Sequence, residues 1–198
     1  MRLVWKGKYT SESDLLRGAL PPDARQFKEP DTPAQLGLAA LPFLVPPLFL
    51  FLLAIAGKAL LWGQFPAVFH FAGFLLALAC IIPHELLHAI AFPKNAEVEI
   101  WHALRDGIAF VYSNAPITKR RFIFLSLLPN LVFGLLPLGI WIFLPPDPSW
   151  TGVFSTLAIT SLTMGAGDYL NVSNAARQVP KGAITQLSGF HSYWYMPQ

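Results

Sequence analysis

The chain has 198 residues, of which 54% are hydrophobic and only 13% are Asp, Glu, Lys or Arg. Soluble domains carry about twice that share of charged residues, so the composition excludes an ordinary soluble domain and indicates an integral membrane protein. The net charge of +3 is spread over polar segments, which argues against nucleic-acid binding, and a single cysteine excludes an internal disulfide.

The first 37 residues are polar, contain several prolines and lack the apolar core of a signal peptide. We expect residues 1–37 to form a cytoplasmic N-terminal arm. A membrane domain is expected over residues 38–170, and a cytoplasmic C-terminal tail over residues 171–198.

Four apolar stretches follow the arm, and each has close to the roughly 20 residues that a spanning helix needs. They lie at about 38–62, 68–92, 122–144 and 152–170. Between the second and third, residues 97–113 combine alternating polarity with the turn signal Arg105-Asp106-Gly107, which predicts a β-hairpin. The predicted fold class is an all-α membrane protein of four transmembrane helices with this small cytoplasmic hairpin.

The distribution of Lys and Arg predicts the orientation in the membrane. Thirteen of the 14 basic residues fall in the arm, the segment 93–121 or the tail, while Lys58 alone lies near the opposite side. Basic residues gather on the cytoplasmic side, so both termini are expected there.

The sequence His84-Glu85-Leu86-Leu87-His88 is an HExxH motif inside the second apolar stretch. On a helix, His84 and His88 leave the same face, and Glu85 can reach a water between them. Two nitrogen ligands and a general base form the arrangement of a catalytic zinc site. Ionisable residues inside a membrane segment are costly, which favours a functional role over a buried structural network.

A catalytic zinc needs a third protein ligand. Asp168 is our prediction because it lies at the same depth in the membrane as the motif and directly follows the small residues Gly165 and Gly167. Asn130 could donate to a developing oxyanion, or it could simply join two helices. Asn171 could orient Asp168 or cap a helix end. Other residues that could provide ligands are Cys80, Glu97, Glu99, His102 and His191.

With these motifs the chain resembles the small bacterial membrane proteins described as putative zincin peptidases, which look like distant relatives of the site-2 proteases. The motif at 84–88 carries most of the resemblance, supported by Pro129-Asn130, Gly167-Asp168 and the tail segments at 179–182 and 189–191. Site-2 proteases take their third ligand from an Asp-Gly pair, whereas here the order is Gly167-Asp168-Tyr169. The resemblance implies a zinc peptidase in the bacterial cell membrane.

The expected function is a membrane-embedded, zinc-dependent peptidase that acts on membrane or membrane-proximal polypeptides near the cytoplasmic face. Glu85 would be the base, His84, His88 and Asp168 the metal ligands, and the hairpin edge a place for an extended substrate. The expected partners are the lipid bilayer and a polypeptide, and the sequence leaves the oligomeric state open. A catalytically inactive metal-binding scaffold and a metal transporter are the alternatives.

Overall fold

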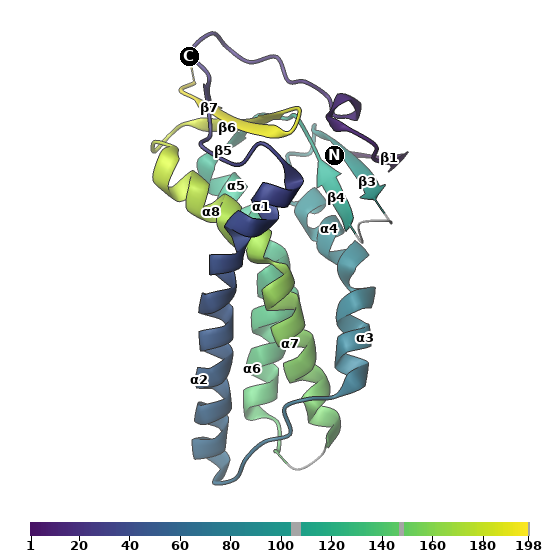
Figure 1. Ribbon diagram of the computed structural model, residues 1–198, viewed down its shortest axis with the longest axis vertical. Helices are drawn as coiled ribbons and strands as arrows, with labels where there is room; N and C mark the ends of the chain where they lie inside the picture. Colours follow the sequence, from purple (N-terminus) through teal and green to yellow (C-terminus); the bar gives the residue numbers. More distant parts are fainter. Residues whose placement is uncertain (104–107, 147–148, 198) are drawn as a thin grey trace.

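The computed structural model describes residues 1–103, 108–146 and 149–197, and it has two parts (Figure 1). Long helices run side by side and form one part, which we call the bundle. Strands and short segments cover one end of the bundle and form the other part, which we call the cap. Both chain termini lie in the cap.

The elements of the fold have the following bounds. The helices are α1 (Pro33–Ala40), α2 (Val45–Trp62), α3 (Phe71–Ala79), α4 (Ile81–Ile90), α5 (Lys119–Pro129), α6 (Leu136–Phe143), α7 (Gly152–Met164) and α8 (Ala166–Gln178). Shorter turns are η1 (Glu12–Asp14), η2 (Leu41–Leu44), the π-helical η4 (Asn130–Leu135) and η5 (Ser149–Thr151). The strands are β1 (Arg2–Lys8), β2 (Arg25–Gln26), β3 (Glu97–Ala103), β4 (Ile108–Tyr112), β5 (Ile117–Thr118), β6 (Ile184–Ser188) and β7 (His191–Tyr195).

Two helical stretches of the described chain are long and apolar enough to cross a bilayer, Pro33–Trp62 and Lys119–Phe143. Helices α3 and α4 make a third if the pair, which is bent by 43°, counts as one span. Large apolar side chains such as Phe49, Leu52 and Leu60 are more than half exposed. Exposed apolar surface on this scale is suited to lipid rather than water, so the helices indicate membrane association.

The prediction of a fourth span at 152–170 is wrong. The chain there forms α7, which has 13 residues, and breaks at Gly165 before α8 begins. Thirteen helical residues extend about 20 Å, which is short of the roughly 30 Å hydrocarbon core. Helix α7 packs between α3 and α6 (Figure 1), and residues along its middle, such as Leu157, Ala158 and Leu162, are buried in the bundle instead of facing lipid.

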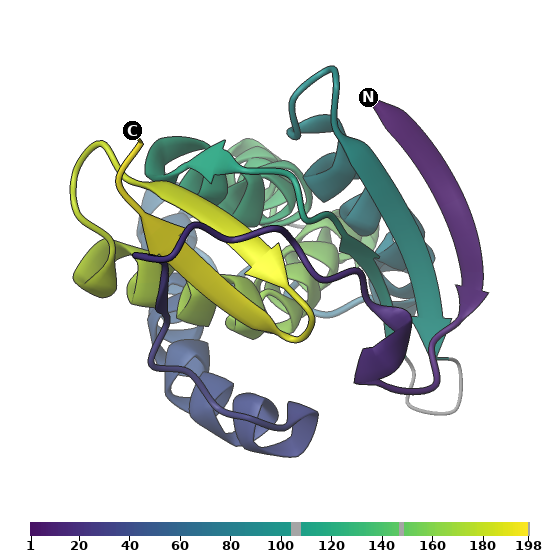
Figure 2. The ribbon, with the colours of Figure 1, turned by 90° about the horizontal axis from the view of Figure 1, so that it is seen from above.

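The all-α fold class is also wrong, because the cap contains two β-sheets (Figure 2). One sheet has the order β1-β3-β4, with β1 parallel and β4 antiparallel to β3. The expected hairpin is present as β3 and β4, whereas its Arg105-Asp106-Gly107 turn lies outside the described residues. The other sheet has the order β2-β7-β6-β5 and is built from the arm, the tail and the segment before α5.

The N-terminal arm joins the two sheets, since β1 belongs to one and β2 to the other (Figure 2). Between them, the Tyr112 hydroxyl of β4 donates to the Leu16 carbonyl of the arm. Further along, Phe27 is buried in the core beneath the second sheet, and the Glu29 carboxylate accepts the Ser192 amide at 2.6 Å. Burial raises the pKa of Glu29. The arm is thus an integral part of the cap.

Lys58 lies at the opposite end of the bundle, fully buried on α2. Its ammonium group donates to the carbonyls of Trp141 and Leu144, at the end of α6, and lies 5.0 Å from the Trp141 ring centroid. The last carbonyls of a helix lack intrahelical donors and form the negative end of its dipole, so a cation there stabilises the end of α6.

Candidate metal centre

The HExxH motif lies on α4, directly after the bend that separates it from α3. Pro83 has no amide hydrogen to donate to Ala79, the last residue of α3, which accounts for the break at this point. The helix then resumes, and the His84 amide donates to the Cys80 carbonyl at 2.8 Å. His84 and His88 lie on one face, with ring centroids 4.9 Å apart.

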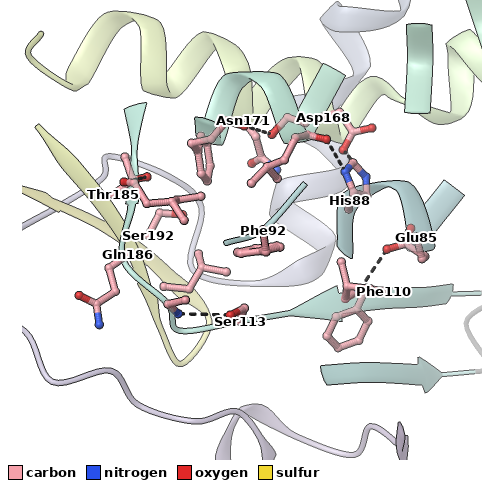
Figure 3. Close-up of a pocket in the computed structure, with 17 residues that line it drawn as sticks. Glu85, His88, Phe92, Phe110, Ser113, Asp168, Asn171, Thr185, Gln186 and Ser192 are labelled. Carbon is pink, nitrogen blue, oxygen red and sulfur yellow. Dashed lines mark hydrogen bonds and ion pairs between the residues drawn. The ribbon is translucent and has the colours of Figure 1, made fainter. Parts of the chain in front are cut away.

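Asp168 faces this pair of imidazoles from α8, and Figure 3 shows its carboxylate beside His88. Its Oδ2 lies 3.4 Å from His84 Nε2, and its Oδ1 lies 3.4 Å from His88 Nε2. Ligand atoms bound to a tetrahedral zinc at about 2.0–2.1 Å are separated by roughly 3.3 Å. The observed separations match this spacing, and two imidazoles with one carboxylate are a donor set that zinc prefers. The three residues therefore fit a zinc ion.

The backbone of α5 fixes the orientation of one imidazole. His88 Nδ1 lies 2.7 Å from the Leu125 carbonyl oxygen, which can only accept a hydrogen bond, so Nδ1 carries the hydrogen. In the neutral ring, Nε2 then keeps its lone pair and points to Asp168. A hydrogen bond of this kind on the distal nitrogen orients metal-binding histidines.

Asn130, the first residue of the π-helical turn η4, contacts Asp168. Its side-chain Nδ2 donates to Asp168 Oδ2 at 2.9 Å, and its Oδ1 accepts the Tyr169 hydroxyl at 3.0 Å. Asn130 is only 3% exposed, so these bonds satisfy an amide that water hardly reaches. The structure thus gives Asn130 an orienting contact with Asp168, the role that the sequence analysis offered to Asn171.

Gly165, at the break between α7 and α8, makes room for that amide. A Cβ atom at this position would lie 1.9 Å from Asn130 Oδ1 and 2.5 Å from its Cγ, which is closer than atoms can pack. The π-helical turn after Pro129 and the absent side chain of Gly165 together bring Asn130 against Asp168.

Glu85 lies beside the two imidazoles and is held by the neighbouring sheet. His84, Glu85 and His88 each offer one ligand atom within 4.8 Å of the others. The Val111 amide of β4 donates to Glu85 Oε2 at 3.0 Å. This bond orients the carboxylate and leaves its other oxygen for a proton.

A cavity of about 250 Å³ opens between the motif helix and the two sheets (Figure 3). Its polar side contains the candidate metal residues His88 and Asp168 together with Glu85. The rest of its lining is mainly apolar or uncharged, with Phe92 and Leu125 among the apolar residues. Asn171 lines this cavity. The side chains of His84, His88 and Asp168 are 10–17% exposed, so water can reach them.

The alternative ligands from the sequence contact other groups. Glu99 pairs with Lys6 at 3.0 Å, and Glu97 pairs with Arg2 at 3.5 Å. His102 is stacked on an aromatic ring of β1. The remaining two are His191, which lies beside Glu29, and Cys80, which is at the α3–α4 junction.

Three contributors to the site escaped the sequence analysis: the Leu125 carbonyl, the Val111 amide and the Tyr169 hydroxyl. The two backbone groups have no signal in a sequence, because every residue carries them. Tyr169 could have been considered, since it directly follows Asp168.

The model of the family described as putative zincin peptidase matches residues 77–184, which is more than half of the chain. The chain belongs to this family. The matched segment includes the HExxH motif, Asn130 and Asp168. Neither the curated proteins nor the solved structures contain a match. The similarity to site-2 proteases stays a prediction.

Proposed function

We propose that this protein is a membrane-embedded zinc metallopeptidase that hydrolyses membrane or membrane-proximal polypeptides at the cap end of the bundle. The observation that carries the proposal is the approach of Asp168 to both motif imidazoles, from a helix some 80 residues further along the chain. Membership of the zincin family supports the same chemistry.

His84, His88 and Asp168 would hold the metal. Zinc, when bound, supplies a Lewis acid that polarises a substrate carbonyl and makes water more acidic. Glu85 is the general base in this proposal: it accepts a proton from the attacking water and returns it to the leaving amine. The Val111 amide keeps the Glu85 carboxylate in place for both transfers.

The free edge of β4 offers a place for an extended substrate. Strand β4 is at the edge of its sheet, and the Val111 amide points away from β3 toward Glu85. A peptide that adds to this edge as a further strand would pass the base and the candidate ligands. The mainly apolar cavity next to them favours an apolar side chain close to the cleaved bond.

The proposed setting is a bacterial cell membrane with the cap and both termini in the cytoplasm. The distribution of Lys and Arg supports this orientation, because 13 of the 14 lie in the arm, the segment 93–121 or the tail. The cap end of the bundle, where the motif lies, would then face the cytoplasm.

The proposal is tested with the full chain in liposomes and a quenched fluorescent polypeptide that carries one membrane span. We expect cleavage that a chelator stops and zinc restores. Glu85→Gln should retain zinc and lose at least about 100-fold in rate, since a general base contributes this much. Glu97→Gln is the matched control, because Glu97 is an exposed acid on β3 and should retain full activity.

Two results would count against the peptidase. Full cleavage by Glu85→Gln with zinc bound would remove Glu85 as the base. Tight zinc binding without cleavage of the span or of any soluble polypeptide would favour the metal-binding scaffold instead.

A further inference from the structure

A group of cations without acidic partners lies where α5 begins. Arg120, Arg121 and Lys181 are exposed, and none of them forms an ion pair with a described residue. Lys119 beside them is already engaged, because its ammonium group donates to the Val179 carbonyl at the end of α8. The three free cations leave a concentrated positive charge at one place on the surface.

Two hollows flank these cations. The larger, of about 700 Å³, lies between the end of α4 and the start of α5, and its lining includes Arg120, Arg121, Ile90 and Phe124. The smaller, of about 410 Å³, is lined by Arg120 and Lys181 among others. Within the described residues, no acidic side chain lines either hollow. An anion could therefore approach without repulsion.

The larger hollow has a charged end and an apolar end. Arg120 and Arg121 are the second and third residues of the apolar stretch Lys119–Phe143, where a spanning helix would leave the hydrocarbon. Phe124 is 51% exposed one turn further into that stretch, and Ile90 of α4 is 60% exposed. Residues three or four apart share a helix face, so the arginines and Phe124 face the same way.

We propose that the larger hollow binds one anionic phospholipid of the surrounding bilayer. The lipid phosphate lies on Arg120 and Arg121, whose guanidinium groups match phosphate oxygens in pairs. Its acyl chain runs down the groove past Ile90 and Phe124. The net negative headgroup complements a hollow whose charged residues are all cations, whereas a zwitterionic lipid would bring its own cation to the arginines.

The position of this lipid site relates it to the candidate metal centre. Ile90 is two residues after His88 on α4, and Phe124 directly precedes Leu125, whose carbonyl accepts the His88 hydrogen bond. The lipid would therefore pack against the two helices that orient His88. The lipid proposal itself depends on membrane association and not on peptidase activity.

The full chain in neutral detergent is titrated with phosphatidylglycerol or phosphatidylcholine, and bound lipids are counted by mass spectrometry of the intact protein. We expect one phosphatidylglycerol per chain in preference to phosphatidylcholine. A basic residue near a membrane surface contributes about fivefold in affinity, so R120Q/R121Q should bind phosphatidylglycerol roughly 30-fold more weakly. Phe124→Ser should also weaken binding, although it leaves the charge unchanged.

The matched control is K8Q/R17Q, which removes two exposed arm cations that pair with no acid among the described residues, and it should bind within twofold of the wild type. Equal losses in the two double variants would show that net charge alone attracts the lipid. If phosphatidylcholine bound as well as phosphatidylglycerol, the groove would recognise acyl chains and not the charge of the headgroup. Displacement of the lipid by millimolar inorganic phosphate would show a site for a soluble anion. Each of these results overturns the proposal.

Discussion

Gly165→Ala should disturb the metal centre without changing any candidate ligand. The new Cβ atom would lie 1.9 Å from Asn130 Oδ1, so the side-chain amide must shift by about 1 Å or more. The 2.9 Å hydrogen bond from Asn130 to Asp168 then breaks, and a buried polar group loses its partner, which costs about 1–3 kcal/mol. Removing an orienting contact of this kind typically lowers metal affinity 10–100-fold. We therefore expect zinc affinity to fall by about that factor.

The assay is competition for zinc between the purified protein and a chromogenic chelator, which needs no substrate. Gly167→Ala is the matched control: it lies two residues further on, in the first turn of α8, and its Cβ would meet nothing within 4 Å. Asn130→Ala should weaken zinc binding similarly, and adding Gly165→Ala to it should cost little more because both act through one contact. An unchanged zinc affinity in Gly165→Ala, or fully additive losses in the double variant, would refute this reasoning.

The remaining predictions concern single contacts. Tyr169→Phe removes only the hydroxyl bonded to Asn130, so zinc affinity should fall by less than in Gly165→Ala in the same competition assay. Lys58→Met removes the ammonium group that donates to the Trp141 and Leu144 carbonyls and should lower the free energy of unfolding by about 2 kcal/mol or more, measured by thermal unfolding in detergent; no change would exclude the capping role. Burial raises the pKa of Glu29 in the folded protein. The protonated side chain therefore contributes to stability at low pH, and this contribution is lost as the pH rises from the pKa of Glu29 in the unfolded chain through its higher pKa in the folded chain. Glu29→Gln should remove this loss, whereas the control Asp31→Asn, at a side chain that is 82% exposed, should retain it. If the melting temperatures of the wild type and Glu29→Gln changed equally between about pH 4 and 7, the assignment to Glu29 would be contradicted.

The sequence predicted elements whose determinants are local. The stretches around 38–62 and 122–144 are predominantly apolar, and both coincide with helices that could span a bilayer. The apolar run at 152–170 misled the prediction, because apolar composition does not distinguish a helix packed inside a bundle from one facing lipid. Gly165, at the break, makes room for Asn130, 35 residues earlier in the chain, and no local pattern reveals this contact.

Two of the missed strands, β1 and β2, depend on distant partners, whereas β6 and β7 form a local hairpin with each other. Strand β1 pairs with β3, about 95 residues later, and β2 has only two paired residues. Such short or remote pairings leave little periodicity in the sequence. In the candidate site, Asp168 approaches the motif histidines, as expected from the equal depth in the membrane that the sequence analysis assigned to them. The orienting bond from Asn130 was not anticipated, since depth along a helix does not specify which way an amide turns.

The two attachments of the arm have a consequence for biosynthesis. Residues 25–26 are made early, yet they pair with residues 193–194, which follow about 170 residues later in the chain. Until β6 and β7 have been synthesised, the arm has no second sheet to bind. The second sheet of the cap can therefore be completed only after β7 has left the ribosome, and a chain that terminates before β7 would lack this part of the cover.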